Sequence, residues 1–193
     1  GITIGTAVSR VRHAIPLILE DTENGLSTRM RRTIAELYDL FNDLGRRINF
    51  FDKEIDTVFR QSEACQRIAK VKGIGLKTAT AVVAAIGKGT EFKNGRHFAA
   101  WLGLVPRQHS SGDRQVLMNI TKKGDKHLRP LFIHGARAVV RVAADNNEGY
   151  LNQWVNQLKE RRGFNKTTVA VANKNARIIW SILHNETEYR PAV

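Results

Sequence analysis

Residues 66–87, QRIAKVKGIGLKTATAVVAAIG, predict two helices joined by a glycine turn. The first helix is expected to end at Lys70, and the turn covers residues 72–75. The second helix carries its apolar residues on one side, at Ala79, Val82, Val83 and Ile86. Apolar residues at this spacing indicate a helix face that packs on a core. We therefore expect helices around this stretch and an all-α protein.

The turn is typical of a helix-hairpin-helix, a motif that holds DNA by its phosphates. In that motif, glycines such as Gly73 and Gly75 let the backbone approach DNA, and N–H groups at the start of the second helix face a phosphate. Lys72 and Lys77 add positive charge beside the turn. The alternative is a helical hairpin that serves only for packing.

Upstream, residues 27–63 predict one long helix with a narrow apolar seam, with Ser27 as its N-cap. The seam residues recur at alternating steps of three and four: Ile34, Leu37, Phe41, Leu44, Ile48, Phe51, Ile55 and Val58. This heptad spacing is typical of a left-handed coiled coil, so we expect the arm to pair with a second copy of the chain. A long helix packed on its own domain is the alternative. Residues 1–26 are expected to be a connector.

Downstream, residues 64–193 predict a compact helical domain. Helices are expected at residues 92–102, 125–144, 149–162 and 166–185. Asp125 is expected to cap the second of these, and Pro130 is tolerable there because it falls near the first turn. Residues 115–120 predict a short strand or one arm of a small β-hairpin.

A serine loop is expected at residues 107–114, RQHSSGDR. A hydroxyl beside a glycine and among cations suits a nucleophile that attacks a phosphodiester, although Ser and Gly are also ordinary turn residues. His109 is a candidate base for Ser110 or Ser111. The basic residues around the loop, candidates for contacts with nucleic acid, are Arg107, Arg114, Lys122, Lys123, Lys126 and Arg129.

The positive charge of the chain is concentrated in its second part. Residues 1–63 hold nine Lys and Arg against ten Asp and Glu, a net charge of 9 − 10 = −1. Because the whole chain carries +13, residues 64–193 carry +14. Such a field favours a polyanion, most commonly nucleic acid. A membrane surface is less suited, because no expected helix opposes bulky apolar residues to a lysine-rich face, and no apolar run is long enough to span a bilayer.

No metal site is predicted from the residues. The single cysteine, Cys65, excludes a thiolate-rich zinc site. His127 and His134 are seven residues apart on one expected helix, too far along its axis to share a metal ion. Both histidines are interpreted as structural.

Four segments in order resemble the C-terminal half of the insertion-sequence transposases related to the Piv and MooV DNA invertases. This is insertion-sequence family one-ten, the bridge-RNA-guided recombinases. The matching segments are KVKGIGLKTATAVVAAIG at 70–87, FxxGRxFAAWLGLxPR at 92–107, HSSG at 109–112 and ITKKGDKHLR at 120–129. The predicted coiled coil before them is also similar to this family.

The resemblance implies a split active site. In such enzymes an N-terminal RuvC-like domain binds magnesium through four acidic residues, and a C-terminal serine attacks DNA and forms a phosphoserine link. Ser111, directly before Gly112, matches the family's serine best, with Ser110 as the alternative. Residues 1–26 do not resemble the acidic domain. We therefore expect a fragment that lacks the magnesium-binding half and that binds nucleic acid without recombining it.

The resemblance also implies partners and a location. The implied partners are DNA, a guide RNA encoded by the mobile element and a second copy of the chain, with no membrane. The implied location is the bacterial cytoplasm, on the nucleoid. The competing interpretation from another class is a non-catalytic helix-hairpin-helix module that binds DNA or RNA.

Overall fold

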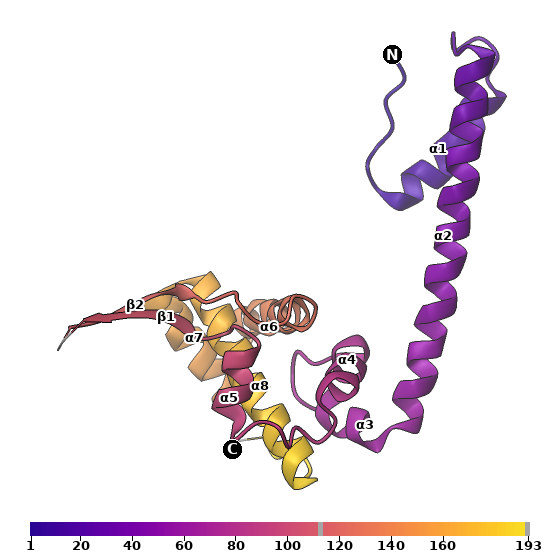
Figure 1. Ribbon diagram of the computed structural model, residues 1–193. Helices are drawn as coiled ribbons and strands as arrows, with labels where there is room; N and C mark the ends of the chain where they lie inside the picture. The colour runs from indigo at the N-terminus through magenta and orange to yellow at the C-terminus, as the bar shows by residue number, and fades with distance from the viewer. Residues whose placement is uncertain (112–113, 192–193) are drawn as a thin grey trace. The chain divides into compact units, whose positions relative to one another are not determined.

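The fold is given by a computed structural model, which describes residues 1–111 and 114–191, apart from the side chains of residues 110, 111, 114, 115 and 117. These residues form eight helices and one two-stranded antiparallel sheet (Figure 1). The prediction of an all-α protein with one small β-hairpin is confirmed. The chain divides into two units, Gly1–Glu54 and Ile55–Val193.

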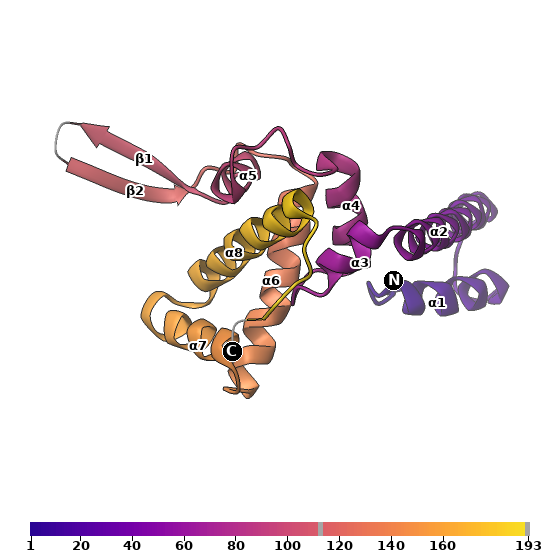
Figure 2. The ribbon, with the colours of Figure 1, turned by 90° about the horizontal axis from the view of Figure 1, so that it is seen from below.

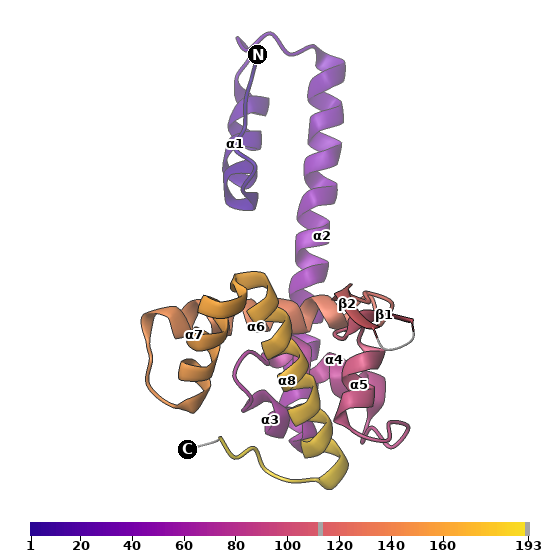
Figure 3. The same cartoon turned by 90° about the vertical axis from the view of Figure 1, so that its left-hand side faces the viewer.

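The first unit is built on a helical hairpin. Helix α1, Val8–Glu20, runs beside the first part of α2, Thr28–Gln61 (Figure 3). The Tyr38 hydroxyl donates a hydrogen bond to the carbonyl oxygen of Arg12 at 3.0 Å. The Arg31 guanidinium donates to the carbonyl oxygens of Ile18 and Leu19 at the end of α1. Helix α2 therefore holds α1 within the stretch that was expected to be a connector.

The long helix predicted from the heptad seam is confirmed as α2, and much of its seam is exposed. Leu37, Leu44, Ile48, Phe51 and Val58 are each more than half exposed. Side chains of this kind are normally removed from water by a partner, because about 25 cal/mol is gained for each Å² of apolar surface buried.

The second unit packs its helices around α8, Phe164–Asn185 (Figure 2). Helix α8 contacts α3, α5, α6 and α7. The bounds of the other helices are α3 Glu63–Ala69, α4 Leu76–Ile86, α5 Gly95–Trp101, α6 Leu128–Asp145 and α7 Tyr150–Arg162. The core contains Phe98 of α5, Phe132 of α6 and Ile179 of α8, all fully buried. The rings of Phe98 and Phe132 meet edge to face, with centroids 6.2 Å apart.

Side chains of Asn94 and Asp125 accept hydrogen bonds at the start of two helices of this unit. The Asn94 side chain accepts a hydrogen bond from the His97 N–H at 3.0 Å and so caps α5. The Asp125 carboxylate accepts from the N–H groups of His127 and Leu128, at 2.8 and 2.6 Å, ahead of α6. These bonds satisfy N–H groups that have no partner within the helix, and they confirm the cap predicted at Asp125.

Candidate nucleic-acid interface

A β-hairpin extends from the helices of the second unit, next to α5 (Figures 1 and 2). Strand β1, Pro106–Ser111, pairs antiparallel with β2, Arg114–Ile120. Opposite pairs include His109 with Val116 and Ser111 with Arg114. The register shifts between Pro106 and Gln108, a β-bulge that gives β2 one residue more than β1. Bulges increase the local twist of a ribbon.

The two candidate serines lie on a strand. Residues 107–111 were expected in a loop, but their backbone belongs to β1, which ends at Ser111. Gly112 and the side chains of Ser110, Ser111 and Arg114 lie outside the described residues. Their proposed roles in chemistry and binding stay predictions.

The base of the hairpin carries exposed polar and basic side chains. Arg107, His109 and Lys123 line a recess of about 490 Å³ together with Pro106, Gln108, Met118 and Thr121. Arg107, His109 and Lys123 are all exposed. The structure therefore brings together two predicted phosphate-binding cations and the candidate base.

The loop between β2 and α6 presents three lysines and is held by a fourth cation. Lys122, Lys123 and Lys126 are exposed. The half-buried Arg129 donates from its guanidinium to the carbonyl oxygen of Gly124 at 3.1 Å. Gly124 packs so closely on the end of α5 that a Cβ there would lie 2.2 Å from the carbonyl oxygen of Trp101. Arg129 thus fixes the loop that carries the lysines.

The glycine turn between α3 and α4 gives its two glycines different surroundings. Gly73 has φ +87 and packs against α6, where a Cβ on Gly135 would lie 1.7 Å from the Gly73 carbonyl oxygen. The Asn175 side chain donates to the Lys72 carbonyl oxygen at 2.9 Å from α8. Gly73 was predicted to let DNA approach, but the backbone it brings close belongs to α6.

Gly75, in contrast, faces open space. It is the N-cap of α4, and a Cβ there would meet no heavy atom within 4 Å. Lys72 and Lys77 on either side of it are exposed. N–H groups in the first turn of a helix have no partner within the helix, and such a terminus attracts anions. This half of the predicted motif remains accessible to a phosphate.

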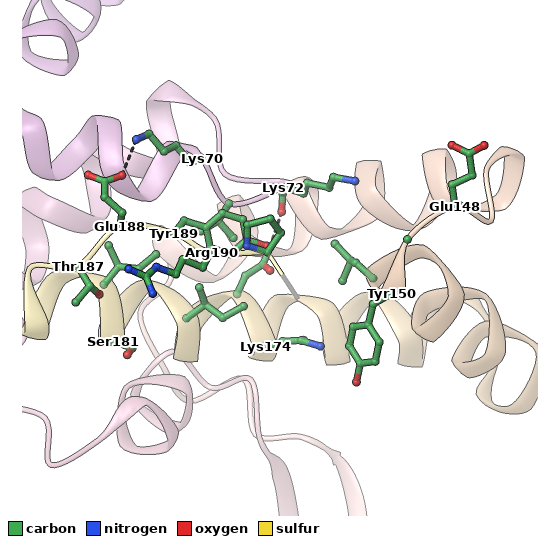
Figure 4. A pocket seen from close by; sticks show the side chains of 17 residues that line it. Lys70, Lys72, Glu148, Tyr150, Lys174, Ser181, Thr187, Glu188, Tyr189 and Arg190 are labelled. Carbon is green, nitrogen blue, oxygen red and sulfur yellow. Dashed lines mark hydrogen bonds and ion pairs between the residues drawn. The ribbon is translucent and has the colours of Figure 1, made fainter. Parts of the chain in front are cut away.

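An open groove beside α8 was not found by sequence reasoning. We call it the α8 groove; it has a volume of about 1060 Å³ (Figure 4). Four segments line it: residues 70–72, 148–151, 174–182 and 187–191. Its cations are Lys70, Lys72, Lys174 and Arg190, and its carboxylates are Glu148 and Glu188.

Two aromatic rings hold Lys174 at one end of this groove. Its ammonium nitrogen lies 4.4 Å from the centroid of the Trp154 ring and 5.1 Å from that of Tyr150. Partial burial lowers the pKa of Lys174, and the positive charge of Arg177 lowers it further. At the other end, the Lys70 ammonium bonds the Glu188 carboxylate at 2.5 Å (Figure 4).

The predicted basic residues therefore fall on separate surfaces. Arg107 and Lys123 share the recess at the hairpin base, whereas Lys72 lines the α8 groove with its neighbour Lys70 and with two cations that are distant in sequence, Lys174 and Arg190. No group of three or more His, Cys, Asp or Glu placed to hold a metal ion occurs among the described residues. Within the same residues, no helix is long and apolar enough to cross a membrane.

Comparison with known proteins identifies relatives for most of the chain. A transposase of insertion sequence element IS1111A from Coxiella burnetii is 40% identical over 190 residues, which cover 98% of this chain and 52% of that protein. A "Probable family 20 transposase" from Pseudomonas aeruginosa is 48% identical over 162 residues, covering 84% of this chain and 48% of that protein. The chain thus spans about half the length of these relatives.

A shorter match concerns a protein that inverts DNA. The pilin gene-inverting protein of Moraxella bovis is 44% identical over 63 residues, which cover 32% of this chain and 20% of that protein. The family model described as "Transposase IS116/IS110/IS902 family" matches residues 65–151, from α3 to the start of α7. Over these residues the chain is similar to transposases of the IS116/IS110/IS902 family.

Proposed function

We propose that this chain is the DNA-binding, serine-bearing part of a transposase that cuts and rejoins DNA by transesterification. The Ser111 hydroxyl attacks a backbone phosphorus, and Ser110 is the alternative nucleophile. A bond forms between the serine Oγ and phosphorus, and the bond between phosphorus and one sugar oxygen breaks. The freed sugar oxygen then takes a proton. Attack by a sugar hydroxyl on the phosphoserine reverses these steps and rejoins DNA. The number of phosphodiesters is conserved, so no external energy source is needed.

The position of the serine backbone is the observation that carries this proposal. Ser111 ends a strand that extends from the helical unit, and cations lie at the base of the same hairpin. Arg107 lies four residues before Ser111, about 13 Å along a strand, so Arg107 and Lys123 would bind neighbouring phosphates of the same DNA strand and hold it in position. Arg107 matches phosphate best because its guanidinium donates two parallel hydrogen bonds. His109, in the same recess, is the candidate base.

The remaining chemistry is assigned to the part of the protein that these residues do not include. A serine hydroxyl is a weak nucleophile until a base or a metal takes its proton. The chain spans about half the length of its relatives. We propose that magnesium is bound by carboxylates in the other half and that residues 1–193 alone bind nucleic acid without recombining it.

The proposed partners are DNA, a guide RNA and a second copy of the chain on the bacterial nucleoid. Support for nucleic acid comes from the net charge of +14 on residues 64–193, counted as 22 Lys and Arg against eight Asp and Glu. Support for self-association comes from the exposed seam of α2. The open N-terminus of α4 at Gly75 provides a further phosphate contact.

A trapped covalent adduct tests the serine chemistry in the full-length protein. A nicked DNA substrate, whose leaving strand diffuses away after attack, should accumulate as a protein adduct, and peptide mapping should place the phosphate on Ser111. We expect Ser111→Ala to lower adduct formation at least about 10³-fold, as removal of a nucleophile generally does. The control is Ser9→Ala, the same chemical change at an exposed position in α1.

The same experiment distinguishes the serine recombinase from the second candidate function, a non-catalytic binding module. The open turn at Gly75 also fits a non-catalytic module that only binds DNA or RNA. If Ser110→Ala and Ser111→Ala each form as much adduct as the unmodified protein, and recombine as fast, the module is the better description.

A further inference from the structure

We infer that the α8 groove is a second nucleic-acid site, which binds a single strand through its phosphates and one unpaired base. The inference rests on the proposed function, because it concerns how the same protein holds its nucleic acid. The α8 groove would be a second binding surface, formed by segments other than the serine hairpin. It would select unpaired strands.

The charge of the groove fits a polyanion. Four cations and two carboxylates line it, and the Lys70–Glu188 ion pair neutralises one cation. Lys72 and Arg190 are exposed, and Figure 4 shows both in the central part of the groove. The positive electrostatic potential of such cations is stronger in a groove than on a flat surface. Successive phosphates of one strand could therefore lie along it.

Tyr150 provides the stacking surface. The residue is 48% exposed although it lines the groove, and the Lys174 ammonium lies over its ring. A cation over one face of a ring is attracted to it and so restrains its orientation. Stacking on an exposed aromatic ring beside cations is how proteins bind single strands without reading their sequence.

Stacking of this kind also gives selectivity against a duplex. A base reaches a protein ring only when it has left the stacked pairs of a double helix. Figure 4 shows Tyr150 and Glu188 toward opposite ends of the groove, with Arg190 between them. One strand that lies along the groove could therefore contact both Tyr150 and Arg190.

Fluorescence anisotropy tests the inference on the full 193-residue chain. The labelled ligands are 20-mers of dT and of U and a 20-base-pair duplex. Tyr150→Ala should weaken binding of the single strands roughly five- to a hundredfold, while Tyr150→Phe keeps most of the affinity. Duplex affinity should stay unchanged in both variants. Tighter binding of U than of dT would identify RNA as the source of the strand, and the reverse order would identify DNA.

Charge variants give an independent measure. Lys72→Ala with Arg190→Ala should lower the slope of log K against log salt by about 1.4, or about 0.7 for each phosphate contact with a single strand. The matched control, Arg141→Ala with Lys166→Ala, removes the same charge from exposed positions that do not line the groove. It should change single-strand affinity much less.

One variant should bind more tightly, a result that misfolding cannot produce. Glu188→Gln removes a negative charge from the groove and releases Lys70, so single-strand affinity should rise roughly two- to fivefold. The inference is overturned if groove and control variants lose affinity equally, or if the groove variants leave single-strand binding unchanged. The proposed serine chemistry would not be affected by that result, because the covalent adduct in the full-length protein tests it separately.

Discussion

Replacing Gly135 by alanine tests the contact that fixes the glycine turn against α6. Gly135 lies within α6, and its Cα faces the carbonyl group of Gly73. A Cβ on Gly135 would lie 1.7 Å from that oxygen, a distance at which the two atoms overlap. Both groups belong to the backbone, so neither can rotate away. The turn must move from the helix by more than about 1 Å to restore normal contact distances.

Two opposing contributions set the expected change in the free energy of unfolding. Helix propensity alone favours alanine over glycine in a helix interior by about 1 kcal/mol. Moving the turn would break the bond from Asn175 to the Lys72 carbonyl oxygen and displace the buried Val71 and Ile74. Losing a buried hydrogen bond costs about 1–3 kcal/mol and overpacking costs about 1–3 kcal/mol. The net expectation is a destabilisation of about 3 kcal/mol.

Urea denaturation followed by circular dichroism measures this change, and thermal melting should show a Tm lower by roughly 10 °C. The matched control is Gly75→Ala, because Gly75 has φ −88 and a Cβ there meets no heavy atom within 4 Å. The control should cost no more than about 1 kcal/mol, the usual loss when alanine replaces glycine at an N-cap. A Gly135→Ala protein that is as stable as the unmodified one, or more stable, would refute the close contact between turn and helix.

Three further substitutions test other parts of the structure. Asn175→Ala should destabilise by about 1–3 kcal/mol in urea, because it leaves the Lys72 carbonyl oxygen without that donor; unchanged stability would mean that water replaces the amide. Asp125→Ala should cost about 1–2 kcal/mol in the same assay through loss of the α6 cap, and a neutral effect would contradict the cap. Leu44→Asp should weaken self-association at least about a hundredfold in sedimentation equilibrium, whereas Asn49→Asp, an exposed position off the seam, should not; equal effects would exclude pairing through the seam.

The helices were predictable because their signals are local. The heptad spacing of α2 and the cap residues Asn94 and Asp125 act within a few residues of where they stand. Pro130 was correctly accepted in α6, where it is the third residue and its missing N–H would have no helical partner. The end of each helix was less predictable, since packing decides how far the last turn extends.

The hairpin and α1 depended on contacts that are distant in sequence. Residues 107–111, Arg-Gln-His-Ser-Ser, lack the alternating β-branched and aromatic residues typical of a strand, and β1 forms because β2 pairs with it. Helix α1 contains Pro16 in its interior, which argues against a helix. Arg31 and Tyr38 of α2 bond its carbonyl oxygens, and that support is visible only in the folded chain.

The candidate site was predictable in its residue types and less so in its geometry. Lys72 and Lys123 were both identified as phosphate contacts. Nothing in their spacing shows that Lys72 lines the α8 groove and Lys123 the recess at the hairpin base. Gly73 could not be distinguished from Gly75 by sequence, because its neighbour Gly135 is more than sixty residues away. The α8 groove combines four separate segments, and no single one of them is unusual in composition.

The distribution of charge explains why binding and pairing would use different parts of the chain. Residues 64–193 carry +14, so two copies that met through these residues would repel each other before any nucleic acid was bound. Residues 1–63 carry −1, and α2 adds an exposed apolar seam that gains free energy from burial without bringing like charges together. Salt should therefore weaken nucleic-acid binding steeply and pairing hardly at all, since counterion release governs the first and apolar burial the second. If raising the salt concentration weakened pairing as steeply as it weakened nucleic-acid binding, the association would have to involve the charged surface instead of the seam.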